Sequence, residues 1–177
     1  MVSSGASGGT DNHSGWPSRQ QQGGWAGLTA VYADEFSRAG IMRGLYRRRC
    51  YATTGVRIGL DMRLNGAPMG SELQFAPADQ RCLSVHVHGT APLDRVEVIS
   101  QGTIVARLPV DSTGSPDLLT EWVDDRRTRP VHDFYYYVRV RQQDGHCAWS
   151  SPIWGNLALP DDPADGGRSL GGPVAWS

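Results

Sequence analysis

Lysine is absent from this sequence: all 17 basic residues among its 177 residues are arginines. They are balanced by 18 acidic residues, which gives a formal net charge of −1. Nucleic-acid-binding proteins usually carry a broad positive field, and a near-neutral chain does not provide one. We therefore expect no nucleic-acid partner.

Cysteine is scarce. Cys50, Cys82 and Cys147 are odd in number, far apart and without a C-x-x-C pair. This spacing argues against both a disulfide framework and a zinc finger. We expect reduced thiols packed in the interior, with a single bridge between Cys82 and Cys147 left open as the alternative.

Targeting segments and common catalytic motifs are also missing. The opening residues, MVSSGASGG, have neither a charged n-region nor an apolar h-region, unlike a secretory signal. No apolar run approaches the roughly 20 residues that span a bilayer. We expect no membrane association and a cytoplasmic location. The P-loop, GxGxxG and GxSxG motifs do not occur, which argues against nucleotide-binding and serine-hydrolase classes of those types.

Residues 1–55 predict a long loop, one helix and one short strand. Residues 1–30 are rich in Gly, Ser and Gln and have no periodicity, which is typical of a loop. A helix is expected over 37–49, with Ser37 as its N-cap. A short strand is expected over 50–54.

The predicted helix carries apolar residues that need a partner. Its stripe consists of Phe36, Ile41, Leu45 and Arg49, with Met42 and Tyr46 beside it. Gly40 and Gly44, four residues apart, leave a smooth groove that admits another backbone. Because one helix and one short strand cannot bury such a stripe, we expect the helix to pack against something else.

From residue 56 onward, apolar and polar residues alternate with a period of two, as in half-buried strands. Strand-like segments occur at 56–64, 82–89, 94–100, 103–110, 118–123, 134–142 and 147–154. Gln101-Gly102 and Asp144-Gly145 are turn signals between them. This pattern predicts an immunoglobulin-like antiparallel β-sandwich over 56–160. Residues 161–177 are rich in Pro, Gly and Asp, and we expect a disordered tail.

Asp11 and His13 are the first candidates for chemistry. They stand two residues apart in a Gly/Ser-rich segment. A carboxylate and an imidazole suit Mn, Fe or Zn, and such an ion activates bound water. Taken alone, however, the residues favour a turn in which Asp11 binds nearby backbone and His13 is hydrated.

Other candidates have plainer alternatives. His86 and His88 share one face of a predicted strand about 6–7 Å apart. Because Val85 and Val87 take the core face, exposed histidines are favoured over a metal chelate. Arg19 either binds phosphate or is a hydrated loop residue. An aromatic and basic strip, formed by Tyr135, Tyr137, Arg139 and Arg141, is either a binding surface or a face packed on a neighbouring domain.

Four segments together resemble a known family. They are TDNHSG (10–15), GLTAVYADEFSRAGIMRGLYRRRCYATTGVRI (27–58), NGAPMGSE (65–72) and YYYVRVRQQDGHCAWSSPIW (135–154). They resemble the C-terminal part of a large bacterial family known only as a domain of unknown function. Members of that family resemble the PHP (polymerase and histidinol phosphatase) superfamily of metallohydrolases.

The resemblance implies a fold and a metal centre. PHP proteins have a distorted (β/α)7 barrel whose centre holds up to three divalent ions, such as Mn, Zn or Fe. Their last motif, Asp-x-His, falls on Asp11 and His13, which become expected metal ligands. Residues 1–55 would then be the truncated βα remnant of the barrel, and residues 56–160 an appended β-sandwich.

The chain departs from the PHP pattern because no His-x-His motif stands before Asp11. Two ligands cannot hold such a centre, so the barrel half is truncated, comes from another chain, or has been lost together with activity. The expected function is that of a C-terminal fragment of a metal-dependent hydrolase acting on a small phosphoester. The alternative is a non-catalytic β-sandwich module for protein interaction or structural support.

Overall fold

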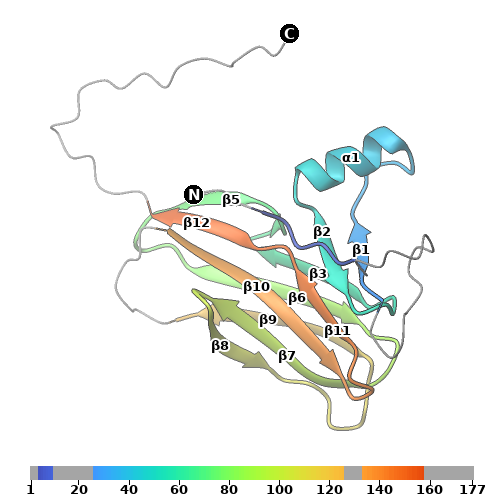
Figure 1. Ribbon diagram of the computed structural model, residues 1–177. Helices are drawn as coiled ribbons and strands as arrows, with labels where there is room; N and C mark the ends of the chain where they lie inside the picture. Colours follow the sequence, from blue (N-terminus) through green and yellow to red (C-terminus); the bar gives the residue numbers. More distant parts are fainter. Residues whose placement is uncertain (1–3, 10–25, 126–132, 158–177) are drawn as a thin grey trace, which may run out of the picture.

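The computed structural model describes residues 4–9, 26–125 and 133–157. This part of the chain consists mainly of β-strands and contains one helix, α1 (Arg38–Tyr46). The strands form two sheets that face each other, and α1 stands beside them (Figure 1). With nine residues, α1 falls short of the length that a membrane-crossing helix needs, and no other helix is found in the described ranges.

The first sheet is a four-stranded antiparallel layer. Its order is β4 (Ala67–Pro68), β3 (Gly59–Leu64), β6 (Arg81–His88) and β9 (Asp117–Asp124). Leu60, Met62 and Leu64 are buried on one side of β3, while Arg63 is exposed on the other. The period-two alternation of the sequence therefore determines which side of this sheet faces the core.

The second sheet is organised around β10 (Asp133–Gln142), the longest strand. One edge of β10 pairs with β7 (Leu93–Ser100), which pairs in turn with β8 (Thr103–Leu108). The other edge pairs with β11 (Cys147–Ser150) and then with β12 (Ile153–Leu157). The sheet ends in β5 (Glu72–Phe75) beside β12, and in β2 (Cys50–Thr53) and β1 (Leu28–Val31) beside β11. All of these pairs are antiparallel except the parallel pair β12–β5.

One core lies between the two sheets. It contains Leu60 and Met62 from the first sheet, and Phe134, Tyr136 and Val138 from the second. A polar link also crosses the layers, because Ser150 accepts a hydrogen bond from Val138 N at 2.9 Å and lies 3.5 Å from the sulfur of Met62. The two layers are thus one packing unit.

The two turn signals lie where the sequence placed them. Gln101 and Gly102 both have positive φ, at 50° and 74°, and join β7 to β8 as a hairpin. Gly145, with φ of 89°, lies in the connection from β10 to β11. In the Gln101-Gly102 hairpin, positive φ at both central residues gives the turn a twist that matches the flanking strands.

The structure differs from the sequence-based expectation at the start of the chain. Leu28–Val31 is a strand, β1, inside the region expected to be a loop. Its backbone is extended because it pairs with β2, which pairs in turn with β11. This pairing does not require alternating apolar and polar residues in β1. The β1–α1–β2 unit therefore continues the second sheet, and nothing in the described residues identifies it as part of a barrel. The boundary predicted between residues 55 and 56 stays a prediction, and the tail 161–177 lies outside the described residues.

Gly155 provides a test of this packing. It pairs with Phe134 across β12 and β10, and a Cβ added there would lie 2.1 Å from the Phe134 ring. That ring cannot move easily, because it packs against Phe75 and Tyr136 at centroid distances of 5.3 and 5.5 Å. We predict that Gly155→Ala lowers the free energy of unfolding by about 1–3 kcal/mol, measured by urea titration.

Gly59→Ala is the matched control, because a Cβ in β3 would meet His88 at an ordinary 3.4 Å. We expect it to change the free energy of unfolding by less than about 0.5 kcal/mol. Equal effects of the two substitutions would contradict the packing described for Gly155.

Candidate functional site

Helix α1 begins where the sequence predicted. Ser37 is its N-cap: the side chain accepts a hydrogen bond from Gly40 N at 3.0 Å. The helix is shorter than expected, since Arg47 is the C-cap and Arg48 has φ of 56°. A residue in the left-handed region ends the helix and directs the chain into β2.

The two glycines of α1 face inward. A Cβ at Gly44 would lie 2.6 Å from Val31 Cγ1 and 2.7 Å from the carbonyl oxygen of Tyr32. A Cβ at Gly40 would lie 2.3 Å from the carbonyl oxygen of Glu35. The expected groove is therefore real, and the backbone that fills it belongs to the same chain.

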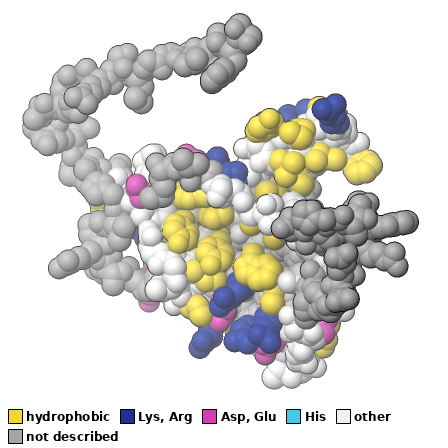
Figure 2. All heavy atoms as spheres, in the orientation of Figure 1, with side chains coloured by type: hydrophobic (Ala, Val, Ile, Leu, Met, Phe, Trp, Pro, Cys, Tyr) yellow, Lys and Arg dark blue, Asp and Glu magenta, His cyan; other side chains and the backbone are white. Residues whose placement is uncertain are grey.

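Most of the large apolar side chains of α1, and that of Phe36 just before its N-cap, face outward as a consequence, while Ile41 is half-buried. Phe36 is fully exposed and Tyr46 is 77% exposed. Together with these two, the exposed apolar residues of this region are Tyr32, Met42 and Leu45, and we call the set the α1 face. Figure 2 shows hydrophobic side chains gathered on this projecting unit. A large apolar patch exposed on a projecting element usually marks an interaction site.

A cavity of about 390 Å³ lies between the α1 unit and the first sheet, lined by Tyr32, Ala33, Asp34, Arg49, Asp61, Arg63, Pro68 and Met69. Its two carboxylates already have arginine partners: Asp61 with Arg63 at 2.9 Å, and Asp34 with Arg49 at 4.0 Å. Burial, followed by the charge of Asp61, raises the pKa of Tyr32 to about 12. The Tyr32 hydroxyl donates to the carbonyl oxygen of Leu60 at 3.0 Å, so it links the residue that follows β1 to β3.

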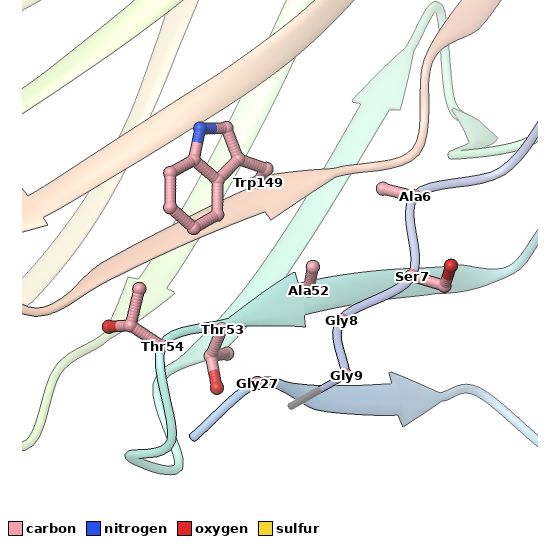
Figure 3. A pocket seen from close by; sticks show the side chains of 9 residues that line it. All are labelled: Ala6, Ser7, Gly8, Gly9, Gly27, Ala52, Thr53, Thr54 and Trp149. Atoms are coloured by element: carbon pink, nitrogen blue, oxygen red, sulfur yellow. The ribbon is translucent and has the colours of Figure 1, made fainter. Parts of the chain in front are cut away.

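A second cavity, of about 400 Å³, opens beside Trp149 (Figure 3). Its floor is formed by Ala52, Thr53 and Thr54, and the segment Ala6–Gly9 lies opposite the indole. This segment is fixed to β1, because Thr29 Oγ1 accepts from Gly8 N and donates to the Gly8 carbonyl, both at 2.9 Å. The size is within the range of small-molecule pockets.

The predicted metal ligands cannot be placed. Asp11 and His13 lie outside the described residues, as does Arg19. The residue range described before them ends at Gly9, which lines the Trp149 cavity. Within the described ranges, no three His, Cys, Asp or Glu side chains are grouped so that they could hold a metal ion. The metal assignment of Asp11 and His13 stays a prediction.

The strand histidines and the cysteines are placed. His86 and His88 are exposed on β6, on the side opposite Val85 and Val87, and His88 Nδ1 contacts the carboxylate of Asp117. All three cysteines are free, so the bridge left open between Cys82 and Cys147 does not form.

Glu97 is not among the candidate residues that the sequence indicates. Its carboxylate is on the side of the second sheet that faces away from the core, yet it is buried beneath arginine side chains. Glu97 of β7 lies between Arg107 and Arg139 in cross-strand register, and its side chain is 2% exposed. Arg139 Nε and Nη2 donate to Glu97 Oε2 at 2.8 and 2.6 Å, and Arg107 Nε is 3.5 Å from Oε1. Desolvation raises the pKa of Glu97, but hydrogen bonds and charge from Arg139, with Arg107 and Arg95, outweigh it and lower the pKa overall.

Comparison with known proteins places part of the chain in a family context. Residues 6–64 match the model of a protein family of unknown function, DUF3604. Uncharacterized proteins of Chlamydia muridarum and Chlamydia trachomatis are each 38% identical over 141 and 143 residues. Each match covers 74% of this chain and 23% of the relative, so the chain spans about a quarter of the length of these curated relatives.

The comparisons support the expected likeness to an uncharacterised bacterial family, but none connects the chain to PHP metallohydrolases. Among solved structures, the crystal structure of an engineered protein is 16% identical, covering 57% of this chain and 20% of that one. Its TM-score of 0.33 is too low to support an argument about fold.

The Glu97 network generates a prediction about pH. Because the folded-state pKa is lowered, the ionised carboxylate stabilises the fold; this contribution is complete above the unfolded pKa of about 4.3 and is lost as the pH falls through the folded pKa. Glu97→Gln should lower the free energy of unfolding at neutral pH by about 1–3 kcal/mol.

Urea titrations of both proteins from neutral to acidic pH would measure this, and the gap between them should shrink toward low pH. Glu121→Gln, which removes an exposed carboxylate from β9, is the control and should have little effect. A gap that stays constant across the whole pH range would refute the assignment.

Proposed function

We propose that this chain is a non-catalytic β-sandwich module of a larger protein, and that the α1 face binds the remaining part of that protein. The observation that carries the proposal is the orientation of α1: its glycines are buried and its large apolar side chains are exposed. A helix of a free-standing domain normally turns its apolar side inward.

The comparisons support a partner of this kind. The family match, residues 6–64, contains the whole β1–α1–β2 unit, and about three quarters of each chlamydial relative lies outside the region matched. The partner therefore has apolar surface that complements Phe36, Met42 and Tyr46. Arg43 and Arg47 pair with Asp34 at 3.9 and 3.5 Å, and these exposed pairs would lie at the rim of the interface.

We further propose that the sandwich is of the immunoglobulin-like class. The adjacency of β3, β6 and β9 in one sheet, and of β8, β7, β10 and β11 in the other, supports this. In such sandwiches the strands A, B and E form one layer, and C′, C, F and G form the other. The cytoplasmic location expected from the sequence stays a prediction.

The docking proposal can be tested with a second polypeptide from the same genome: the part of the larger protein that corresponds to the unmatched three quarters of the chlamydial relatives. The double substitution Phe36→Ser, Tyr46→Ser should weaken binding to that polypeptide at least about tenfold, measured by calorimetry. It should change the free energy of unfolding of the isolated chain by less than about 0.5 kcal/mol, because both side chains are exposed.

Leu119→Ser is the control, since Leu119 is 80% exposed but lies on β9 of the first sheet. It should leave binding unchanged. Equal binding by the double variant and the unsubstituted chain would refute the proposal. A homodimer detected by sedimentation would also refute it if the double substitution dissociates that dimer. The α1 face would then bind a second copy of the chain.

The alternative proposal is that the chain does take part in catalysis: the larger protein is a metal-dependent hydrolase of phosphoesterase type, to which this chain contributes Asp11 and His13. The position of both residues within the family-matched segment 6–64 supports it. A Mn, Zn or Fe ion held by these and further ligands would supply an activated hydroxide for attack on a small phosphoester. The further ligands would come from the missing barrel half, in the same or another chain.

We predict that Asp11→Ala or His13→Ala abolishes hydrolysis of a model phosphodiester or phosphomonoester by the complete assembly. The stability of the sandwich should change little, because the core described above is built from residues 58–157. Asn12→Ala is the control, and metal analysis of each purified assembly provides a readout besides activity. Unchanged turnover and metal content in both variants would refute the ligand assignment.

A further inference from the structure

The outer side of the second sheet carries aromatic and arginine side chains in neighbouring positions. The alternation of β10 points Tyr135, Tyr137, Arg139 and Arg141 away from the core, while the residues between them are buried. The strand register adds two tryptophans, with Trp154 opposite Tyr135 and Trp149 opposite Arg139. Arg95 and Arg107 of the neighbouring strands complete the set, which we call the outer-sheet surface. Figure 2 shows hydrophobic side chains over the centre of this sheet and arginines beside them.

The aromatic rings of this surface are arranged for stacking. Tyr135 and Tyr137 are nearly parallel, with ring centroids 6.3 Å apart and 17° between their planes. Both lie only partly buried, as do Trp149 and Trp154. The polar tips of all four rings, two phenol hydroxyls and two indole N–H groups, have no hydrogen-bond partner among the described residues. Partly exposed Tyr and Trp usually direct such tips to water or to a ligand.

The arginines give the surface a positive charge. Arg95, Arg107, Arg139 and Arg141 have two carboxylate partners between them, Asp94 and Glu97. Four positive and two negative charges leave a local net charge of +2 around these arginines. On the same side of the sheet, Asp133 continues the outward alternation of β10, and Glu72, opposite Trp154, pairs with Arg48. The four arginine side chains remain 40–71% exposed although they are paired, so they can still bind an anion.

The Trp149 cavity lies at the side of this surface. Trp149 and the small-residue segment Ala6–Gly9 both line it (Figure 3). Gly8 and Gly9 contribute only backbone to this lining, so the described residues leave room there for a planar ring beside the indole.

We propose that the outer-sheet surface binds an anionic glycan. Sugar rings have apolar C–H faces that stack on aromatic rings, and hydroxyl groups that can pair with the free phenol and indole tips. Carboxylate, sulfate or phosphate groups on the sugar would bind the exposed arginines, which favour bidentate contacts with such anions. The α1 face instead presents Phe36, Met42 and Leu45, whose side chains have no polar tip, and this apolar character suits a protein partner.

Calorimetry of the purified chain with three probes tests this proposal: oligogalacturonate for carboxylate, a heparin oligosaccharide for sulfate, and a ribitol phosphate oligomer for phosphate. Methyl-esterified oligogalacturonate keeps the sugar rings of the first probe and removes its charge. At least one charged probe should bind with a Kd below about 1 mM, and more weakly as ionic strength rises. The esterified probe should bind at least about tenfold more weakly than its charged form.

Substitutions locate the site. Trp149→Ala should weaken binding at least about tenfold, and Arg141→Gln about three- to tenfold. Tyr46→Ala and Arg38→Gln, which remove an exposed aromatic and an exposed arginine from α1, are the matched controls and should leave binding unchanged. Tyr137→Phe keeps the aromatic ring and removes only its hydroxyl group, so it should fold even if Trp149→Ala does not. It should also weaken probe binding, because one hydrogen-bonding group is lost.

The signals of the indole N–H groups in NMR spectra give a readout that needs no substitution. Bound probe should shift the signals of Trp149 and Trp154 and leave that of Trp122, which packs against the core, in place. Absence of binding by all three charged probes would overturn the proposal. Binding that moves the Trp122 signal alone, or that is lost equally in the α1 controls, would overturn it too.

Discussion

The pairing of β10 on both edges is the constraint on which the rest of the structure depends. Its first half pairs with β12, its second half with β11, and its other edge with β7. Its buried side chains, from Phe134 to Val140, form the middle of the core. Through β11 it also holds β2 and β1, so the α1 unit is attached to the sandwich by a continuous ladder of backbone hydrogen bonds. The orientation of both proposed surfaces follows from this one strand.

The sequence predicted most of this sandwich because alternation and turn chemistry are local signals. Strands β3, β6 and β10 show period-two burial, and Gln101-Gly102 forms the hairpin expected of it. Strands β1 and β5 were not predicted, because each is short and is held at a sheet edge by a distant partner. The aromatic strip of β10 was predicted, but Trp149 and Trp154 join it only through register, which a single sequence does not reveal. Glu97 looks like an ordinary outward-facing acid until the arginines of both neighbouring strands are placed around it.

The glycines of α1 explain how a helix can turn its apolar side outward. A side chain at position 44 would hold the helix away from Val31 and Tyr32, and one at position 40 would collide with the backbone of Glu35, whereas glycine lets the helix lie close to both segments. The contact is close but small, since it contributes little apolar area on the inner side. The helix is thus held mainly by its connections and charged contacts, which leaves Phe36 and Tyr46 available to another surface. The α1 face and the outer-sheet surface differ in chemistry because different constraints direct their side chains.

Strand β9 has a consequence for the behaviour of the chain at high concentration. It is an outermost strand of the first sheet, eight residues long, and within the described residues only β6 pairs with it. Such an edge invites a second molecule to add its own strand, which is a common start of aggregation. Asp117, Glu121 and Asp124 lie along it, so two copies meeting there would bring like charges together. Acidification would remove that repulsion, and the edge would then be open to intermolecular β-sheet growth.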